Sequence, residues 1–204
     1  MRIILIGASG HGKVCAEIAE LSGKYDELFF LDDDKELTVC GSHPVVGVTA
    51  DFKKYLDDRT EFFVSIGNAD SRKRIQEDVE NANGRIATLL HLKAMIGKDV
   101  QIGDGSIVMA GAVINIGSKI GRGVIVNTCS SIDHDCTIGD YVHVAVGSHV
   151  CGTVNVSEGT WIGAGAIINN NVNICGGCTI GAGAVVIKDI NLPGIYVGVP
   201  GKRK

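Results

Sequence analysis

The sequence predicts a two-part protein, in which an α/β Rossmann-like βαβαβ domain is followed by an all-β parallel β-helix. Up to residue 85, strand and helix patterns alternate, which is typical of a parallel sheet with helical crossovers. From residue 96, Ile or Val recurs at every sixth position, and a six-residue repeat is typical of a parallel β-helix. We therefore expect domains at 1–85 and 86–192, with a C-terminal tail at 193–204.

The first part should contain strands near 3–6, 28–31 and 61–66, and helices near 14–21 and 70–81. A glycine-rich loop, G-A-S-G-H-G-K at 7–13, follows the first strand. It is not a P-loop, because Val14 rather than Ser or Thr follows Lys13, and its first G-x-x-G interval departs from a dinucleotide fingerprint. A loop that leads into a helix still offers backbone N–H groups to a diphosphate, so it stays a candidate phosphate-binding site.

The repeat runs from Ile96 through Leu192 without interruption. Four residues after most of these anchors stands a small side chain, and alternation along a strand turns both positions inward. Gly, Asn or Asp is common three residues after the anchor, as a tight corner requires. Three hexads make one triangular coil, so the segment holds about five to six coils.

Composition excludes several classes of partner. The net charge of −4 gives no electrostatic reason to expect nucleic acid or an anionic membrane as a partner, and no apolar stretch approaches a membrane span. Seven scattered cysteines do not form a disulfide framework. Cys175 and Cys178 form the one CxxC pair, and the repeat phase turns Cys178 inward, so we do not expect a zinc site. These features favour a reduced, cytoplasmic protein without a metal.

His134 is the strongest candidate for chemistry, because Asp133 and Asp135 flank it. Two neighbouring carboxylates favour a more basic imidazole, as a general base near neutral pH needs. The matching position one coil later is Gly152, which leaves room for a ligand. His143 should point outward next to Trp161, one side of the triangle away from His134. A site that uses both histidines therefore needs a neighbouring subunit, most simply in a closed trimer.

Six segments together resemble one family, the bacterial hexapeptide-repeat sugar acetyltransferases that include UDP-4-amino-sugar N-acetyltransferases of the bacillosamine pathway and sialic acid O-acetyltransferases. The resemblance covers essentially the whole chain, and it implies a left-handed β-helix. It is carried by the loop at 7–13, Leu31-Asp32-Asp33, Ser65-Ile66-Gly67-Asn68, His134-Asp135-Cys136, the segment from Gly139 to Gly147 around His143, and Gly198-Val199-Pro200-Gly201-Lys202.

The resemblance also implies roles for single residues. His134 would be the general base and Asp135 would raise its basicity, although some relatives have Glu at that position. Acetyl-CoA would meet His143 at its acetyl carbonyl, the Gly152 backbone near its thioester, and a groove between subunits lined by Gly163 and Gly181. The sugar nucleotide would meet Ser9, Gly10, His11, Asp32, Asp33, Gly67 and Asn68.

We therefore expect an enzyme that moves acetyl directly from acetyl-CoA to the amino group of a nucleotide-linked sugar, most simply a UDP-4-amino-4,6-dideoxy sugar. The sequence leaves O-acetylation of sialic acid or another sugar open. Two more distant alternatives are a zinc-dependent enzyme of the carbonic anhydrase type, built on His134, His143 and His149, and a non-catalytic scaffold with a nucleotide sensor. The histidine spacing does not resemble that of the zinc enzymes.

Overall fold

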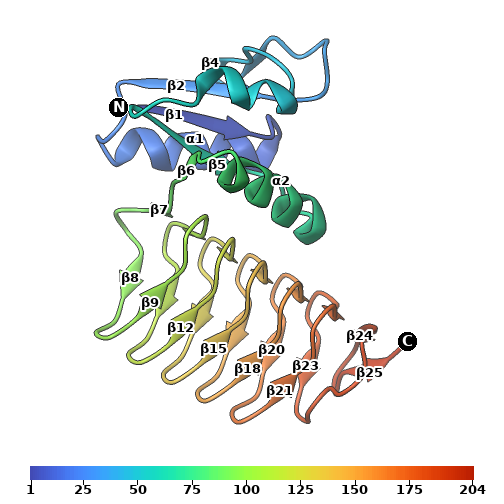
Figure 1. Ribbon diagram of the computed structural model, residues 1–204. Coiled ribbons are helices and arrows are strands. Elements are labelled where there is room, and N and C mark those ends of the chain that lie inside the picture. The colour runs from blue at the N-terminus through green and yellow to red at the C-terminus, as the bar shows by residue number, and fades with distance from the viewer. The chain divides into compact units, whose positions relative to one another are not determined.

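The computed structural model describes residues 1–204, which form two compact units, Met1–Leu92 and Lys93–Lys204. The expected α/β fold and the expected β-helix are both present (Figure 1). No helix is both long and apolar enough to cross a lipid bilayer.

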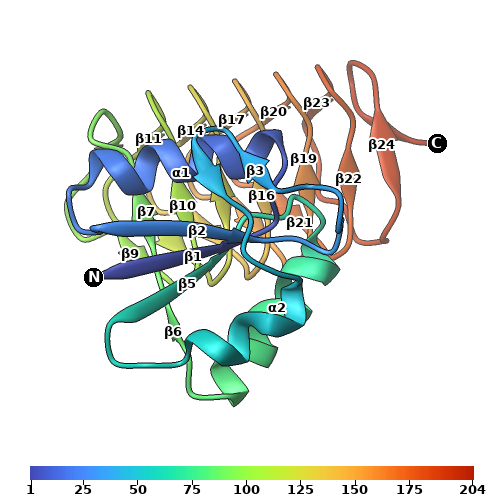
Figure 2. The same ribbon diagram turned by 90° about the horizontal axis from the view of Figure 1, so that it is seen from above.

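The first unit is built on a parallel sheet with the strand order β2-β1-β5-β6. Figure 2 shows α1 on one side of this sheet and α2 on the other. The chain passes from β1 to β2 on one side of it, and the connection after β2 returns to β5 on the other side of β1. The sheet therefore has a topological switch point between β1 and β5, where open α/β sheets bind ligands. The elements are β1 (Arg2–Ile6), α1 (Gly10–Leu21), β2 (Glu27–Leu31), β3 (Val39–Cys40), β4 (His43–Pro44), the 3-10 helix η1 (Thr49–Tyr55), β5 (Thr60–Val64), α2 (Ala69–Asn81), β6 (Arg85–Ile86) and β7 (Leu89–Leu90).

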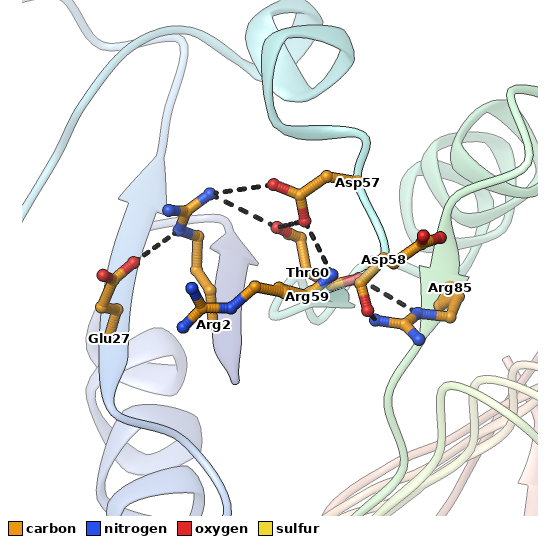
Figure 3. A network of polar contacts seen from close by, with 7 residues as sticks. All are labelled: Arg2, Glu27, Asp57, Asp58, Arg59, Thr60 and Arg85. Atoms are coloured by element: carbon orange, nitrogen blue, oxygen red, sulfur yellow. Dashed lines mark hydrogen bonds and ion pairs between the residues drawn. The ribbon is translucent and has the colours of Figure 1, made fainter.

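Polar contacts tie the starts of these strands together (Figure 3). Arg2 donates from Nε to Glu27 Oε2 at 2.7 Å and contacts Asp57 Oδ2 at 3.4 Å, while Arg85 donates to a carbonyl of the loop before β5. These contacts occupy the amino edge of the sheet. The carboxyl edge, where β1, β2 and β5 end, is left to the loops that form the candidate site.

The second unit is the β-helix, in which every strand from β8 to β23 is two residues long. Its strands are β8 (Met95–Ile96), β9 (Gln101–Ile102), β10 (Ile107–Val108), β11 (Val113–Ile114), β12 (Lys119–Ile120), β13 (Ile125–Val126), β14 (Ser131–Ile132), β15 (Thr137–Ile138), β16 (His143–Val144), β17 (His149–Val150), β18 (Asn155–Val156), β19 (Trp161–Ile162), β20 (Ile167–Ile168), β21 (Asn173–Ile174), β22 (Thr179–Ile180), β23 (Val185–Val186), β24 (Ile195–Val197) and β25 (Lys202–Arg203).

These strands form three faces that the chain visits in turn. The first face runs β10-β13-β16-β19-β22-β24, the second β8-β11-β14-β17-β20-β23, and the third β9-β12-β15-β18-β21. Within a face, Ile107 pairs in parallel with Ile125, and Ile125 with His143. Residues one coil apart therefore lie side by side, as the repeat predicts.

The interior of the β-helix follows the predicted phase. The anchors from Val108 to Val186 are buried, and so are most of the small residues between them, including Cys136 and Cys178. Most corner residues three positions after the anchor have positive φ. This conformation favours glycine, but Asp135 (φ 57°) and Tyr141 (φ 58°) also adopt it.

The last predicted anchor is wrong. Val186 pairs with Ile168, eighteen residues earlier, whereas Ile190 bridges to Ile174, sixteen residues earlier, so the final coil is two residues shorter. Ile190 is 5% exposed and takes the inward position, while Leu192 is 59% exposed. The chain then continues as β24, which pairs in parallel with β22, and ends in the antiparallel β25.

Candidate active site

The carboxyl edge of the first unit's sheet surrounds a cavity of about 310 Å³. Loops that follow β1, β2 and β5 line it, and they bring together four of the predicted acceptor residues: Ser9, Asp32, Asp33 and Gly67. Gly10, His11 and Asn68 do not line it. The structure therefore assembles part of the predicted set at the switch point of the sheet, where the fold favours a ligand.

The glycine-rich loop is shorter than the sequence predicts, because α1 begins at Gly10. Only residues 7–9 form the connection, and Gly10 and His11 lie in the first helical turn. Gly7 has φ of 112°, and a Cβ on Gly12 would lie 2.4 Å from the Gly7 carbonyl oxygen. Packing of α1 against the loop therefore requires glycine at both positions, whether or not a ligand binds.

A buried arginine, which the sequence did not single out, supports the next loop. Arg72 on α2 is fully buried and donates from Nη1 to the carbonyls of Ile66 at 2.8 Å and Gly67 at 2.9 Å. Burial and the Arg72 charge together lower the pKa of His11 to about 4. His11 is thus neutral at physiological pH, with one N–H to donate.

Several side chains predicted to bind the acceptor accept hydrogen bonds from backbone N–H groups of the protein itself. Asp32 accepts from Ala8 N at 2.7 Å through Oδ2, and from the N–H of residue 34 through Oδ1. Asn68 caps α2 by accepting from the N–H of residue 71 at 2.9 Å. Asp33 accepts from Thr49 N at 2.9 Å through Oδ1, which leaves Oδ2 without a protein partner at the cavity wall.

A second cavity, of about 510 Å³, shares Asp33, Thr49, Arg74 and Ile75 with the first. Arg74 is the cation common to both, and its nearest acid is Asp78, at 3.7 Å. The sequence pattern did not indicate this residue. Its only signal was its place near the start of a polar helix that follows a binding loop.

His134 lies at a corner of the β-helix, between the second and third faces. Its Nδ1 is 2.9 Å from Asp135 Oδ2, and the side chain is 52% exposed. The Asp135 hydrogen bond, and then the Asp133 charge, raise the pKa of His134. Because a carboxylate can only accept, the neutral ring carries its proton on Nδ1, and Nε2 keeps the lone pair that a base needs.

The basic nitrogen lies against Gly152. A Cβ on that residue would be 2.6 Å from His134 Nε2 and 2.7 Å from Cε1. The open space that the sequence predicts beside Gly152 is therefore partly occupied by the imidazole itself. Any side chain at this position would displace the ring.

His143 lies on β16, on the first face, and its ring stacks on Trp161 with centroids 6.2 Å apart. Asn127, which no sequence pattern indicated, places its side-chain nitrogen 3.2 Å from His143 Nε2. Within one chain, His134 and His143 are thus on different parts of the β-helix, as predicted. His149, the third histidine of the zinc alternative, lies with its Nδ1 2.8 Å from Ser131 Oγ.

The glycines predicted to line the CoA groove have steric roles within the coil stack. A Cβ on Gly163 would lie 2.5 Å from the Ile180 carbonyl oxygen, and one on Gly181 would lie 2.7 Å from a Val197 methyl carbon. Cys178 is buried and Cys175 is half-buried, with sulfur atoms 3.5 Å apart. No group of three or more His, Cys, Asp or Glu side chains is placed to hold a metal.

A parallel β-helix of six-residue repeats is the fold expected of the hexapeptide-repeat acyltransferases that the sequence resembles. Residues 2–79 match the sequence model of the PglD N-terminal domain. The acetyltransferase domain of PglB from Neisseria gonorrhoeae FA1090 is 38% identical, with a TM-score of 0.95, over 100% of this chain and 99% of that one. The same domain has been solved with acetyl coenzyme A.

Two other proteins are about 30% identical to this chain. PerB from Caulobacter crescentus, solved with CoA and GDP-perosamine, is 31% identical, with a TM-score of 0.95, over 100% of this chain and 97% of that one. UDP-N-acetylbacillosamine N-acetyltransferase of Bacillus subtilis (strain 168) is 30% identical over 111 residues, which are 53% of this chain and 51% of that enzyme. The match thus spans about half the length of this curated relative. The chain belongs to the PglD-like family of acetyl-CoA-dependent nucleotide-sugar N-acetyltransferases.

Proposed function

We propose that this protein transfers acetyl from acetyl-CoA to the amino group of a nucleotide-linked amino sugar, with a UDP-4-amino-4,6-dideoxy sugar as the favoured acceptor. The names of the relatives support this class of substrate: one is a UDP-N-acetylbacillosamine N-acetyltransferase, and another was solved with GDP-perosamine. The PglB domain with acetyl coenzyme A supports the donor.

The observation that carries the proposal is the His134–Asp135 hydrogen bond beside Gly152. It holds the ring in the tautomer whose Nε2 can accept a proton. In the proposed reaction, the acceptor nitrogen attacks the thioester carbonyl carbon and loses a proton to Nε2. The tetrahedral intermediate then expels the CoA thiolate, which takes the proton from the imidazolium. A C–N bond replaces the C–S bond, and no acyl-enzyme forms.

We assign His143 and the Gly152 backbone to the thioester. A ring N–H or a backbone N–H near the carbonyl would stabilise the negative charge that develops on its oxygen. The stack on Trp161 and the Asn127 contact fix the orientation of the His143 ring. The coils pack so closely at Gly163 and Gly181 that these positions carry no side chain, which would leave the proposed CoA surface smooth there.

The acceptor nucleotide is assigned to the cavity of the first unit. Arg74 supplies a cation for its diphosphate, and Asp33 Oδ2 supplies an acceptor for a ribose hydroxyl or a base N–H. Ser9 and Gly67 line the same cavity, with Gly10, His11 and Asn68 on the elements that begin there.

The proposal includes a homotrimer with sites at subunit interfaces, because His134 and His143 do not share a face within one chain. It also places the protein in the cytoplasm, where acetyl-CoA is available and its seven cysteine thiols stay reduced.

The test is release of CoA with a panel of UDP-, GDP- and dTDP-amino sugars, CMP-sialic acid and free sialic acid. We expect turnover with a UDP-amino sugar, and a loss of about 10²- to 10⁴-fold in His134→Ala. Unchanged turnover in this variant would overturn the mechanism, and turnover with sialic acid alone would overturn the acceptor. Mixing inactive His134→Ala and His143→Ala chains should restore about a quarter of the sites if each site uses two subunits.

A further inference from the structure

The two carboxylates beside His134 have different partners. Asp135 bonds the imidazole, whereas Asp133 Oδ1 accepts from the backbone N–H of His134 at 2.8 Å. The same oxygen accepts from Asn115 Nδ2 at 2.8 Å. Asp133 is thus held from two sides through one oxygen, and Oδ2 has no partner in the protein.

Asn115 occupies the matching position one coil before Asp133, next to β11, which pairs with β14 in parallel. The residue contributes nothing to the β-helix interior, because its side chain bonds a carboxylate on the outside. The His134 side chain is half exposed, so packing alone does not fix it. Hydrogen bonds must therefore set the place of the ring and of the charge beside it.

Asp133 and Asp135 are the charged groups around His134 within the β-helix. The coil before it presents Asn115, Ile116 and Gly117 at this corner, and the coil after it presents Cys151, Gly152 and Thr153, none of which carries a formal charge at neutral pH. The thiol of Cys136, directly after the corner, is buried, and burial raises its pKa. If the charge of Asp133 is removed, no charged side chain of a neighbouring coil at this corner replaces its effect on the pKa of His134.

We propose that Asn115 is a positioning residue that acts through Asp133: it holds this carboxylate against the His134 backbone and so fixes the general base of the proposed acetyl transfer. The inference rests on the proposed function of His134. It adds a chain of two hydrogen bonds: Asn115 on one coil donates to Asp133 on the next, and Asp133 accepts from the backbone of His134.

The experiment compares Asn115→Ala, Asp133→Asn and the double variant. Each single change should lower kcat on the order of tenfold, part of the 10²- to 10⁴-fold contribution of a general base. The acidic limb of the kcat/KM profile should move to lower pH, more for Asp133→Asn than for Asn115→Ala, because the charge that favours the imidazolium is lost or displaced. The double variant should match Asp133→Asn, since Asn115 acts through that residue.

Two further measurements separate the outcomes. Asn155→Ala removes a similar exposed bond between coils, to Asn173 at 2.9 Å, and should leave both kcat and the pH profile unchanged. NMR titration can follow the His134 ring signal, which is assigned because it disappears in His134→Ala. The His134 pKa should be highest in the wild type, lower in Asn115→Ala and lowest in Asp133→Asn, and this measurement does not depend on turnover. If His134→Ala is inactive but Asn115→Ala titrates and turns over like the wild type, this inference fails while the proposed function stands. If His134→Ala stays active, the proposed function fails.

Discussion

The contact between Gly152 and His134 makes a sharp prediction about a single methyl group. In Gly152→Ala, the new Cβ would lie 2.6 Å from Nε2 if nothing moved, whereas ordinary contacts begin at 3.4 Å. The ring must therefore retreat by about 0.8 Å. It can do so, because the His134 side chain is half exposed and rotates at its own χ angles.

The displacement should cost activity rather than stability. A shift of about 1 Å in a reacting group can cost about 10²-fold in rate, which is close to 2.7 kcal/mol. Gly152 does not have a positive φ, so alanine fits the backbone, and the effect on the free energy of unfolding should be within about 0.5 kcal/mol. We expect kcat to fall about 10²-fold with an unchanged melting temperature.

The assay is CoA release under saturating acceptor, with thermal melts of the same samples. Asn170→Ala, at the matching exposed position one coil later, is the control and should behave like the wild type. In a His134→Ala background, Gly152→Ala should cause no further loss, because the clash is with the missing ring. Wild-type turnover in Gly152→Ala, or an equal loss in the control, would refute the reasoning.

Three other changes probe the two units. Asp135→Asn removes the hydrogen-bonded charge that raises the pKa of His134, so the acidic limb of kcat/KM should move to lower pH and kcat should fall about tenfold or more; a limb that stays in place would contradict this. Arg72→Met leaves two loop carbonyls without their donor and should destabilise the protein to urea by about 3 kcal/mol. Gly12→Ala places a Cβ 2.4 Å from a carbonyl oxygen and should cost about 1–3 kcal/mol of stability, whereas a Cβ at Gly10 meets nothing within 4 Å and should cost none; equal urea midpoints would exclude the packing argument.

The β-helix was predictable from the sequence because every coil repeats one geometry. Each inward position is specified many times over, and the corner at residues 133–135 follows from the phase. The prediction failed where the repeat changed length. Leu192 is apolar and keeps the six-residue interval, yet Ile190 is equally apolar, and only the strand pairing distinguishes them.

The polar contacts around His134 were predictable because the residues that make them are neighbours in the sequence. His134, Asp133 and Asp135 are consecutive, so their interaction follows from the chain itself. Arg72 and Asn127 were missed because each meets its partner through the fold. Asn115 is an intermediate case, since the repeat phase places it beside Asp133 but does not reveal that their side chains bond.

The glycines in the predicted binding loops fall into two groups, according to whether an added Cβ would clash with the rest of the protein. Gly7 and Gly12 are demanded by packing, since a Cβ at either would lie within 3 Å of another part of the protein. Gly10 and Gly67 have ordinary φ and nothing within 4 Å of an added Cβ, so neither backbone conformation nor protein packing requires glycine there. For Gly67, which lines the cavity with Asp33, close approach of the proposed acceptor to the backbone would give glycine a physical reason. The Gly67 carbonyl accepts a hydrogen bond from the buried Arg72 guanidinium, which would hold this stretch of backbone in place for the proposed acceptor.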